Sequence, residues 1–205
     1  MYLSRVKINT SIRNTRKFLG SLQVIHASVE SCFADHDTTR KLWRLDYFCG
    51  QPYLLVLSRE KPDFTSLVEQ YGYAGEDGEI RDYQRVLDCL EDGKRFRFRL
   101  CANPVHSIKD EGGKRGKVVP HVTICQQEEW LEQKCEKLGF SLDEFLVVQR
   151  ELKRFTRQGK QITLHTAVYE GILTIRQAEI FRETLVQGIG RAKSYGCGLL
   201  TLARL

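Results

Sequence analysis

The same order of secondary-structure elements can be read twice along this chain of 205 residues, and the repeat limits the fold more than any other feature. In the first half, residues 2–8 alternate apolar and polar side chains, as a half-buried strand does. Ser21 can cap a following helix, in which apolar residues recur at helical spacing. Residues 42–48 and 53–58 predict two strands, and residues 64–68 predict a second helix before a last strand. This is the order of a ferredoxin-like unit.

The second half gives the same order. Residues 95–100 alternate strictly, so that Phe96 and Phe98 share one face while three arginines line the other. Next come a helix stopped by Gly139, two strands around the Gln158-Gly159 turn, a third helix and a terminal strand. We expect the strand after that turn to be broken at Glu170-Gly171. The prediction is an α+β chain of two tandem ferredoxin-like (RRM-like) domains, residues 1–85 and 94–205, with a boundary within 75–94.

A glycine-rich stretch at residues 188–198 is the strongest candidate for a ligand-binding loop. Four glycines surround Arg191, Lys193 and Ser194 and allow close approach of the backbone to a ligand. Two of the four have another explanation, because Gly188 can end the preceding helix and Gly198 can open a strand. The order helix, glycines, strand differs from that of a P-loop or a dinucleotide-binding loop. The stretch therefore predicts a phosphate-contacting loop, for either a phosphodiester backbone or a mononucleotide.

Charge is segregated along the chain more strongly than its net value of +6 indicates. Residues 59–92 hold 4 basic and 10 acidic side chains, whereas residues 94–120 hold 8 basic and 2 acidic ones. Basic surfaces attract phosphate backbones, although solvated lysine-rich faces and charged sheet edges are also common in proteins that bind no anion. The basic candidates outside the glycine-rich stretch lie in one loop and around one turn: Lys114, Arg115 and Lys117, then Lys153, Arg154, Arg157 and Lys160.

Composition excludes several other classes. The sequence has no apolar run long enough for a membrane span and no signal-peptide pattern at its N-terminus. Its seven cysteines are scattered, without a CxxC or a Cys/His cluster, so we expect reduced thiols, no metal site and no cofactor. A cytoplasmic location is expected.

His26 lies at the edge of the apolar stripe of the first helix, close to the basic residues Arg13, Arg16 and Lys17, which we expect in a loop. It can be a packed histidine that bonds a carbonyl group. It can also be a general acid or base, because an ordinary imidazole changes charge near neutral pH.

Several segments together are similar to one known family. They are Phe98–Pro104, Trp130–Leu131, Tyr169–Gly171 with Leu173–Ile175, the opening Met1–Ser4, the histidine of the first helix and above all Gly188–Leu205. Through them the whole chain resembles the CasE family of CRISPR-associated RNA endonucleases of the type I-E system, within the repeat-associated RNA-binding superfamily. The resemblance implies tandem ferredoxin-like domains and metal-independent cleavage of precursor CRISPR RNA at the repeat hairpin, by attack of a 2′-hydroxyl that leaves a 2′,3′-cyclic phosphate. It also implies that the product stays bound within a multisubunit surveillance complex.

The resemblance further assigns roles to residues. His26 matches the catalytic histidine of the family, and the glycine loop, with Gly190, Arg191, Lys193, Ser194 and Gly196, would follow the RNA backbone near the cleavage site. Relatives often have a tyrosine where Gln23 stands, and some have a basic residue where Glu30 and Ser31 stand. As a hypothesis, Arg16 or Lys17 stabilises the phosphorane and Glu30 orients His26 or stabilises its charged form.

Two other functions compete with this one. The missing tyrosine would fit a non-cleaving RNA-binding subunit of the same fold. A small-molecule enzyme could use the glycine loop for a nucleotide phosphate, but basic charge spread over several loops argues against it, since a mononucleotide needs only one such site.

Overall fold

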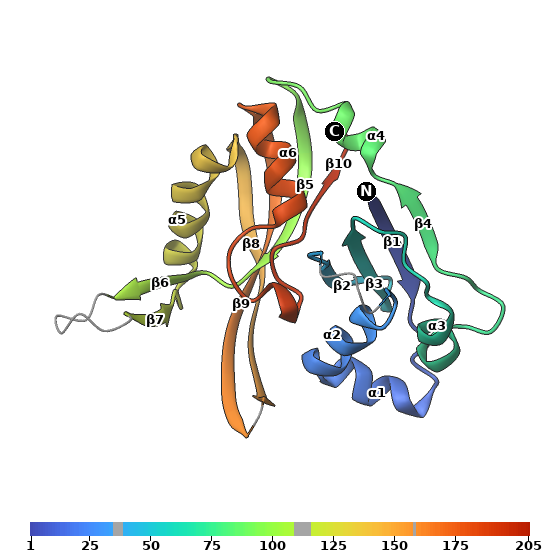
Figure 1. Cartoon of the computed structure of the whole chain (residues 1–205). Helices are drawn as coiled ribbons and strands as arrows, with labels where there is room; N and C mark the ends of the chain where they lie inside the picture. The colour runs from blue at the N-terminus through green and yellow to red at the C-terminus, as the bar shows by residue number, and fades with distance from the viewer. Residues whose placement is uncertain (35–38, 109–115, 158) are drawn as a thin grey trace. The chain divides into compact units, whose positions relative to one another are not determined.

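The computed structural model describes residues 1–34, 39–108, 116–157 and 159–205, which form two compact units (Figure 1). The first unit contains Met1–Cys89 together with Lys193–Leu199, and the second contains Leu90–Ala192 together with Leu200–Leu205. No helix in these ranges is long and apolar enough to cross a membrane.

The first unit has the ferredoxin-like order of elements. They are β1 (Tyr2–Lys7), α1 (Arg13–Gly20), α2 (Leu22–Glu30), β2 (Leu42–Phe48), β3 (Gln51–Ser58), α3 (Thr65–Tyr71), β4 (Glu79–Asp82) and α4 (Gln84–Asp88). The sheet is antiparallel with the strand order β2-β3-β1-β4. The two central strands are therefore the first and third of the unit, as a ferredoxin-like fold requires.

The basic segment expected as a loop is the helix α1, so that prediction was wrong. Thr15 and Phe18, three residues apart, are both buried on one face of α1, and the ring of Phe18 stacks on that of Tyr71 with 4.3 Å between centroids. A buried pair at helical spacing stabilises even a short helix, although its other positions are charged.

The second unit repeats the arrangement with an insertion. Its elements are β5 (Arg95–Ala102), β6 (Val105–Ile108), β7 (Lys117–Pro120), α5 (Ile124–Cys135), the 3-10 turn η1 (Glu136–Leu138), β8 (Phe140–Arg157), β9 (Lys160–Ile175), α6 (Ala178–Gln187) and β10 (Leu200–Ala203). The sheet order is β10-β5-β9-β8, and β6 and β7 form a separate hairpin between the first strand and its helix. Both units are thus ferredoxin-like, as predicted.

Strands β8 and β9 form a long hairpin that extends well beyond the helices of its unit (Figure 1). The expected interruption at Glu170-Gly171 does not occur, because β9 is continuous through both residues. The partner strand absorbs the irregularity instead, with register shifts between Leu142 and Glu144 and between Val147 and Gln149. A Cβ at Gly171 would lie 2.0 Å from the carbonyl oxygen of Glu144, so only glycine fits opposite the first of these bulges.

The observed second unit differs from residues 94–205 at its start, which is Leu90, and in one internal segment. Residues 193–199 belong to the first unit, where the 3-10 turn η2 (Lys193–Tyr195) packs against α2 and β2. Two contacts explain this: the guanidinium of Arg44 donates to the carbonyl oxygen of Leu199 at 2.8 Å, and Gly196 lies against the indole of Trp43. The glycine-rich stretch is therefore divided between the two units.

Candidate active site and nucleic-acid interface

His26 is held on α2 by a well-defined helix start and a buried face. The hydroxyl of Ser21 accepts from the amide of Val24, as expected for an N-cap, and Ile25 and Val29 are buried. The His26 side chain is 34% exposed, and its Nδ1 lies 3.7 Å from Oε1 of Glu30, one turn later. Nδ1 is itself buried and has no hydrogen-bond partner among the described residues. A small rotation of the Glu30 carboxylate would supply one and leave Nε2 free to accept a proton.

Lys41 belongs to the same cluster, although it was not among the residues predicted from the sequence. Its ammonium lies 3.2 Å from the second carboxylate oxygen of Glu30 and 5.0 Å from the ring of Phe33, and its side chain is only 3% exposed. Glu30 is thus held by Lys41 on one side and faces His26 on the other. A lysine just before a strand gives no sequence signal for such a role.

The turn η2 brings part of the glycine-rich stretch to the same helix. It packs against α2 and β2, and it carries Lys193 and Ser194. Burial, and then the positive charge of Arg40, lower the pKa of Lys193 below that of an ordinary lysine. Two cations close together beside a helix that carries a histidine suit a phosphate group, which would relieve their mutual repulsion.

Arg16 and Lys17 are exposed on α1, which packs against α2. Their helix is therefore next to that of His26. A direct contact of either side chain with a substrate stays a prediction.

The predicted RNA-contacting residues of the second unit lie at several places on it. Arg191 is exposed, and Gly190 has a φ of +79° at a point where a Cβ would lie 3.2 Å from the ring of Trp130. In the β8–β9 hairpin, Lys153 pairs with Glu151 at 3.1 Å and Arg154 is exposed, while the backbones of Arg157 and Lys160 face each other at the tip. Lys117 is exposed on β7, and Lys114 and Arg115 lie outside the described residues.

The arginine-lined face of β5 is largely paired within the protein. Arg95 bonds Asp143 at 2.8 Å, and Arg99 bonds Glu170. These carboxylates pair with arginines that the alternating pattern of residues 95–100 places on one face of the strand. The strand therefore needs no nucleic acid to explain its charge.

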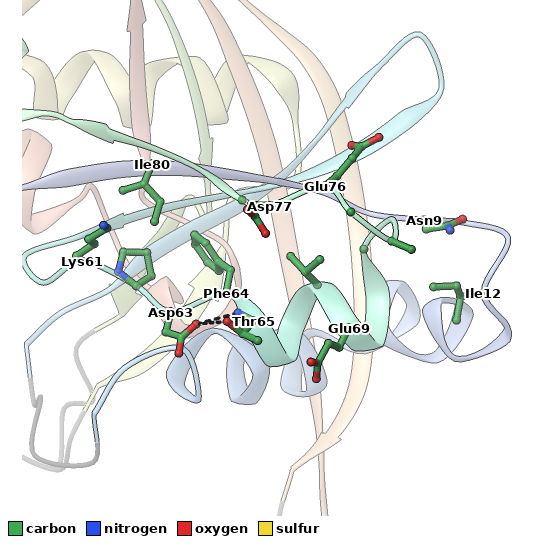
Figure 2. Close-up of a pocket in the computed structure, with 16 residues that line it drawn as sticks. Asn9, Ile12, Lys61, Asp63, Phe64, Thr65, Glu69, Glu76, Asp77 and Ile80 are labelled. Carbon is green, nitrogen blue, oxygen red and sulfur yellow. Dashed lines mark hydrogen bonds between the residues drawn. The ribbon is translucent and has the colours of Figure 1, made fainter.

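A cavity of about 880 Å³ in the first unit has the wrong charge for a polyanion. Figure 2 shows it beside α3, with carboxylates at its edge. The lining includes Asp63, Glu69, Glu76 and Asp77, against one lysine, Lys61. A nucleotide phosphate would be repelled here, so this cavity is not a candidate for the predicted phosphate-contacting site.

Comparison with known proteins places these features in a family. A family model described as CRISPR associated protein matches residues 1–204. The chain belongs to this family. It is 30% identical over 221 residues to the CRISPR-associated endoribonuclease Cse3 of Thermus thermophilus, an alignment that covers 99% of this chain and 100% of that protein.

Two further relatives of this CRISPR-associated protein are informative. The Cascade subunit CasE of Escherichia coli is 36% identical over 123 residues, which cover 57% of this chain and 61% of that one. The solved structure of Cse3 bound to a 19 nt RNA matches with a TM-score of 0.85 at 28% identity, over 99% of this chain and 100% of that one. The family resemblance and the fold inferred from the sequence are thereby confirmed.

Proposed function

We propose that this chain is an endoribonuclease that binds the stem-loop of a CRISPR repeat and cleaves precursor CRISPR RNA without a metal ion. The observation that carries the proposal is the position of His26, partly exposed with Nδ1 toward Glu30, in a chain similar to the Cse3 endoribonuclease along its full length. The family resemblance supplies the reaction, and the first unit supplies residues that suit it.

The reaction needs two proton transfers and the stabilisation of negative charge. The 2′-oxygen attacks phosphorus, so that the O2′–P bond forms while the P–O5′ bond breaks. A base takes the proton of the 2′-hydroxyl, and an acid gives a proton to the departing 5′-oxygen. The products are a 2′,3′-cyclic phosphate and a 5′-hydroxyl.

His26 carries one of these proton transfers, and Glu30 acts as a positioning residue. The Lys41 ammonium fixes one oxygen of Glu30, and the other oxygen orients the imidazole through Nδ1. Lys193 and Arg40, with Arg16 or Lys17 from the neighbouring helix, stabilise the phosphorane.

The long β8–β9 hairpin and the glycine-rich stretch hold the RNA. Arg154, Arg157 and Lys160 near the hairpin tip contact stem phosphates, and Arg191 with Lys193 and Ser194 follows the backbone toward the cleavage site. An A-form stem has a narrow major groove, so recognition relies mainly on shape and phosphate positions.

The chain also joins a multisubunit complex and works in the cytoplasm under this proposal. The E. coli relative is named as a Cascade subunit, which supports assembly with other subunits around the guide RNA. All seven cysteines are free thiols, which supports a reducing compartment.

The decisive experiment is single-turnover cleavage of a labelled repeat hairpin in excess EDTA. The parent should yield a cyclic phosphate, whereas His26→Ala, or a substrate with a 2′-deoxy at the attacking nucleotide, should give no product although hairpin binding persists. Binding without cleavage by the parent would identify an RNA-holding subunit instead, with Gln23 as the leading explanation. Failure to bind the hairpin at all would refute the proposal.

A further inference from the structure

A second cavity lies in the second unit, and its two histidines have no role in the proposed cleavage. It encloses about 410 Å³ between the base of the β6–β7 hairpin, α5, η1 and the start of the glycine-rich stretch. We call it the histidine pocket and define it by His106, His121, Trp130, Lys134, Lys137 and Gly190. Its volume falls in the range of small-ligand sites in proteins.

The charge of the histidine pocket is opposite to that of the acidic cavity in Figure 2. Lys134 and Lys137 supply two ammonium groups, and no carboxylate is among the described lining residues. Lys134 lies over the indole of Trp130, 5.2 Å from the ring centroid, so its ammonium is held at the pocket wall. The electrostatics of this cavity favour an anion.

The two imidazoles indicate where the anion would bind. Their ring centroids are 4.6 Å apart. His121 is fixed through its backbone, because its amide donates to the carbonyl of Pro104 at 2.9 Å and its carbonyl accepts from the side chain of Gln127 at 2.9 Å. Its Nδ1 is nevertheless buried without a hydrogen-bond partner among the described residues. Buried polar atoms are normally paired, so this nitrogen is available to bond a ligand that enters the cationic pocket.

Protonation of His121 would be coupled to such a ligand. Burial, and then the charge of His106, lower the pKa of His121, and the charge of Glu129, the smallest of the three causes, acts in the opposite direction. The imidazole is therefore mainly neutral at pH 7, and a bound anion would favour its charged form.

The glycine-rich stretch supplies the remaining wall and connects the pocket to the proposed RNA path. Gly190, with its positive φ, lies directly against Trp130, and a Cβ there would approach two ring carbons to 3.2 Å. Only a residue without a side chain lets the chain pass so close to the indole. The next residue, Arg191, is exposed and assigned to the RNA backbone.

We propose that the histidine pocket binds a phosphate group through His106, His121, Lys134 and Lys137. Under the proposed function, on which this part of the inference rests, the phosphate belongs to a nucleotide of the bound RNA. The alternative source of the same chemistry is a free nucleotide. The pocket is lined by residues of the second unit and shares none with the cluster around His26, so we assign it to holding RNA and not to cleavage.

Proton NMR of the histidine rings tests the phosphate chemistry without RNA. The chain has five histidines, so the signals can be assigned with His106→Asn and His121→Asn. Inorganic phosphate and adenosine monophosphate should shift the His106 and His121 signals and leave that of His165 in place, whereas adenosine should shift neither. The same two signals should shift when the repeat hairpin is added. A shift with the nucleotide but not with the hairpin would identify free nucleotide as the source, and no shift with any phosphate-bearing probe would overturn the proposal.

Salt-dependent hairpin binding tests the RNA source. Lys134→Ala and Lys137→Ala should each weaken hairpin binding. Each should also make the negative slope of log K against log salt shallower by about one. The matched control is Lys94→Ala, a surface lysine of the same unit that pairs with Glu91 at 3.2 Å and should leave the slope unchanged. Parent-like slopes in both pocket variants would exclude an RNA phosphate while leaving the endoribonuclease proposal intact. Failure of the parent to bind the hairpin would refute that proposal but not the NMR result.

Discussion

Replacing Gly196 by alanine tests how the glycine-rich stretch is fixed to the first unit. The backbone at Gly196 has a φ of +79°, and a Cβ there would lie 2.8 Å from Cζ3 of Trp43, which is only 1% exposed. A left-handed conformation costs a residue with a Cβ about 1–2 kcal/mol. Forcing a methyl group into a packed core costs about 1–3 kcal/mol more. We therefore expect the free energy of unfolding to fall by about 2–5 kcal/mol.

Calorimetry or circular dichroism against temperature would measure the effect. For a protein of this size each kcal/mol corresponds to about 2–4 °C, so a central value of about 3 kcal/mol lowers the Tm by about 6–12 °C. Gly75→Ala is a matched control, because Gly75 has the same φ of +79° in the same unit but open space where its Cβ would lie. It should show only the backbone part, about 1–2 kcal/mol.

A functional measurement follows from the same contact. Gly196 is adjacent to η2, which carries Lys193 and Ser194. In Gly196→Ala, the clash with Trp43 should displace this turn and slow single-turnover cleavage about 10-fold or more, because small misplacements of groups around a reacting centre are costly. Gly75→Ala should cleave at the parent rate. Equal losses of Tm in the two variants would mean that residue 196 does not meet Trp43, and the reasoning would be wrong.

Four further changes have defined expected results. Glu30→Gln should lower the single-turnover rate roughly 10-fold with unchanged hairpin affinity, because the imidazole loses its positioning carboxylate, and a parent-like rate would contradict that role. Arg157→Ala should weaken hairpin binding in a filter assay more than it slows cleavage of bound RNA, and equal affinity would remove the hairpin tip from the interface. As pH rises, the RNA affinity of the parent should begin to fall at a lower pH than it would if Lys193 had the pKa of an ordinary lysine, because the pKa of Lys193 is lowered and its positive charge is lost earlier. Lys193→Arg should abolish this fall. Gly171→Ala should lower the Tm more than Gly159→Ala does, since a Cβ at 171 meets the Glu144 carbonyl and one at 159 meets open space.

Local pattern was sufficient for most of the secondary structure. The strict alternation of residues 95–100, the N-cap at Ser21 and the stop at Gly139 all appear as predicted, because each depends on neighbours within a few residues. Because these elements were predicted locally, their repeated order was enough to predict two ferredoxin-like units. The errors are local patterns overruled by distant partners: α1 is stabilised by the packing of Phe18 on Tyr71, and β9 continues through Gly171 because β8 forms the bulge.

The sequence by itself determined the family, the fold class and the identity of His26 as the leading catalytic candidate. Apart from Glu30, one helical turn away, the residues around that histidine were decided by tertiary structure alone. Lys41 and Lys193 are far from His26 along the chain, and no spacing rule relates them to it, yet one bonds Glu30 and the other lies on a turn that packs against α2. The histidine pocket likewise collects residues from four separate segments. Sequence periodicity reports only neighbours along one element, whereas a site depends on distances between elements, which only folding sets.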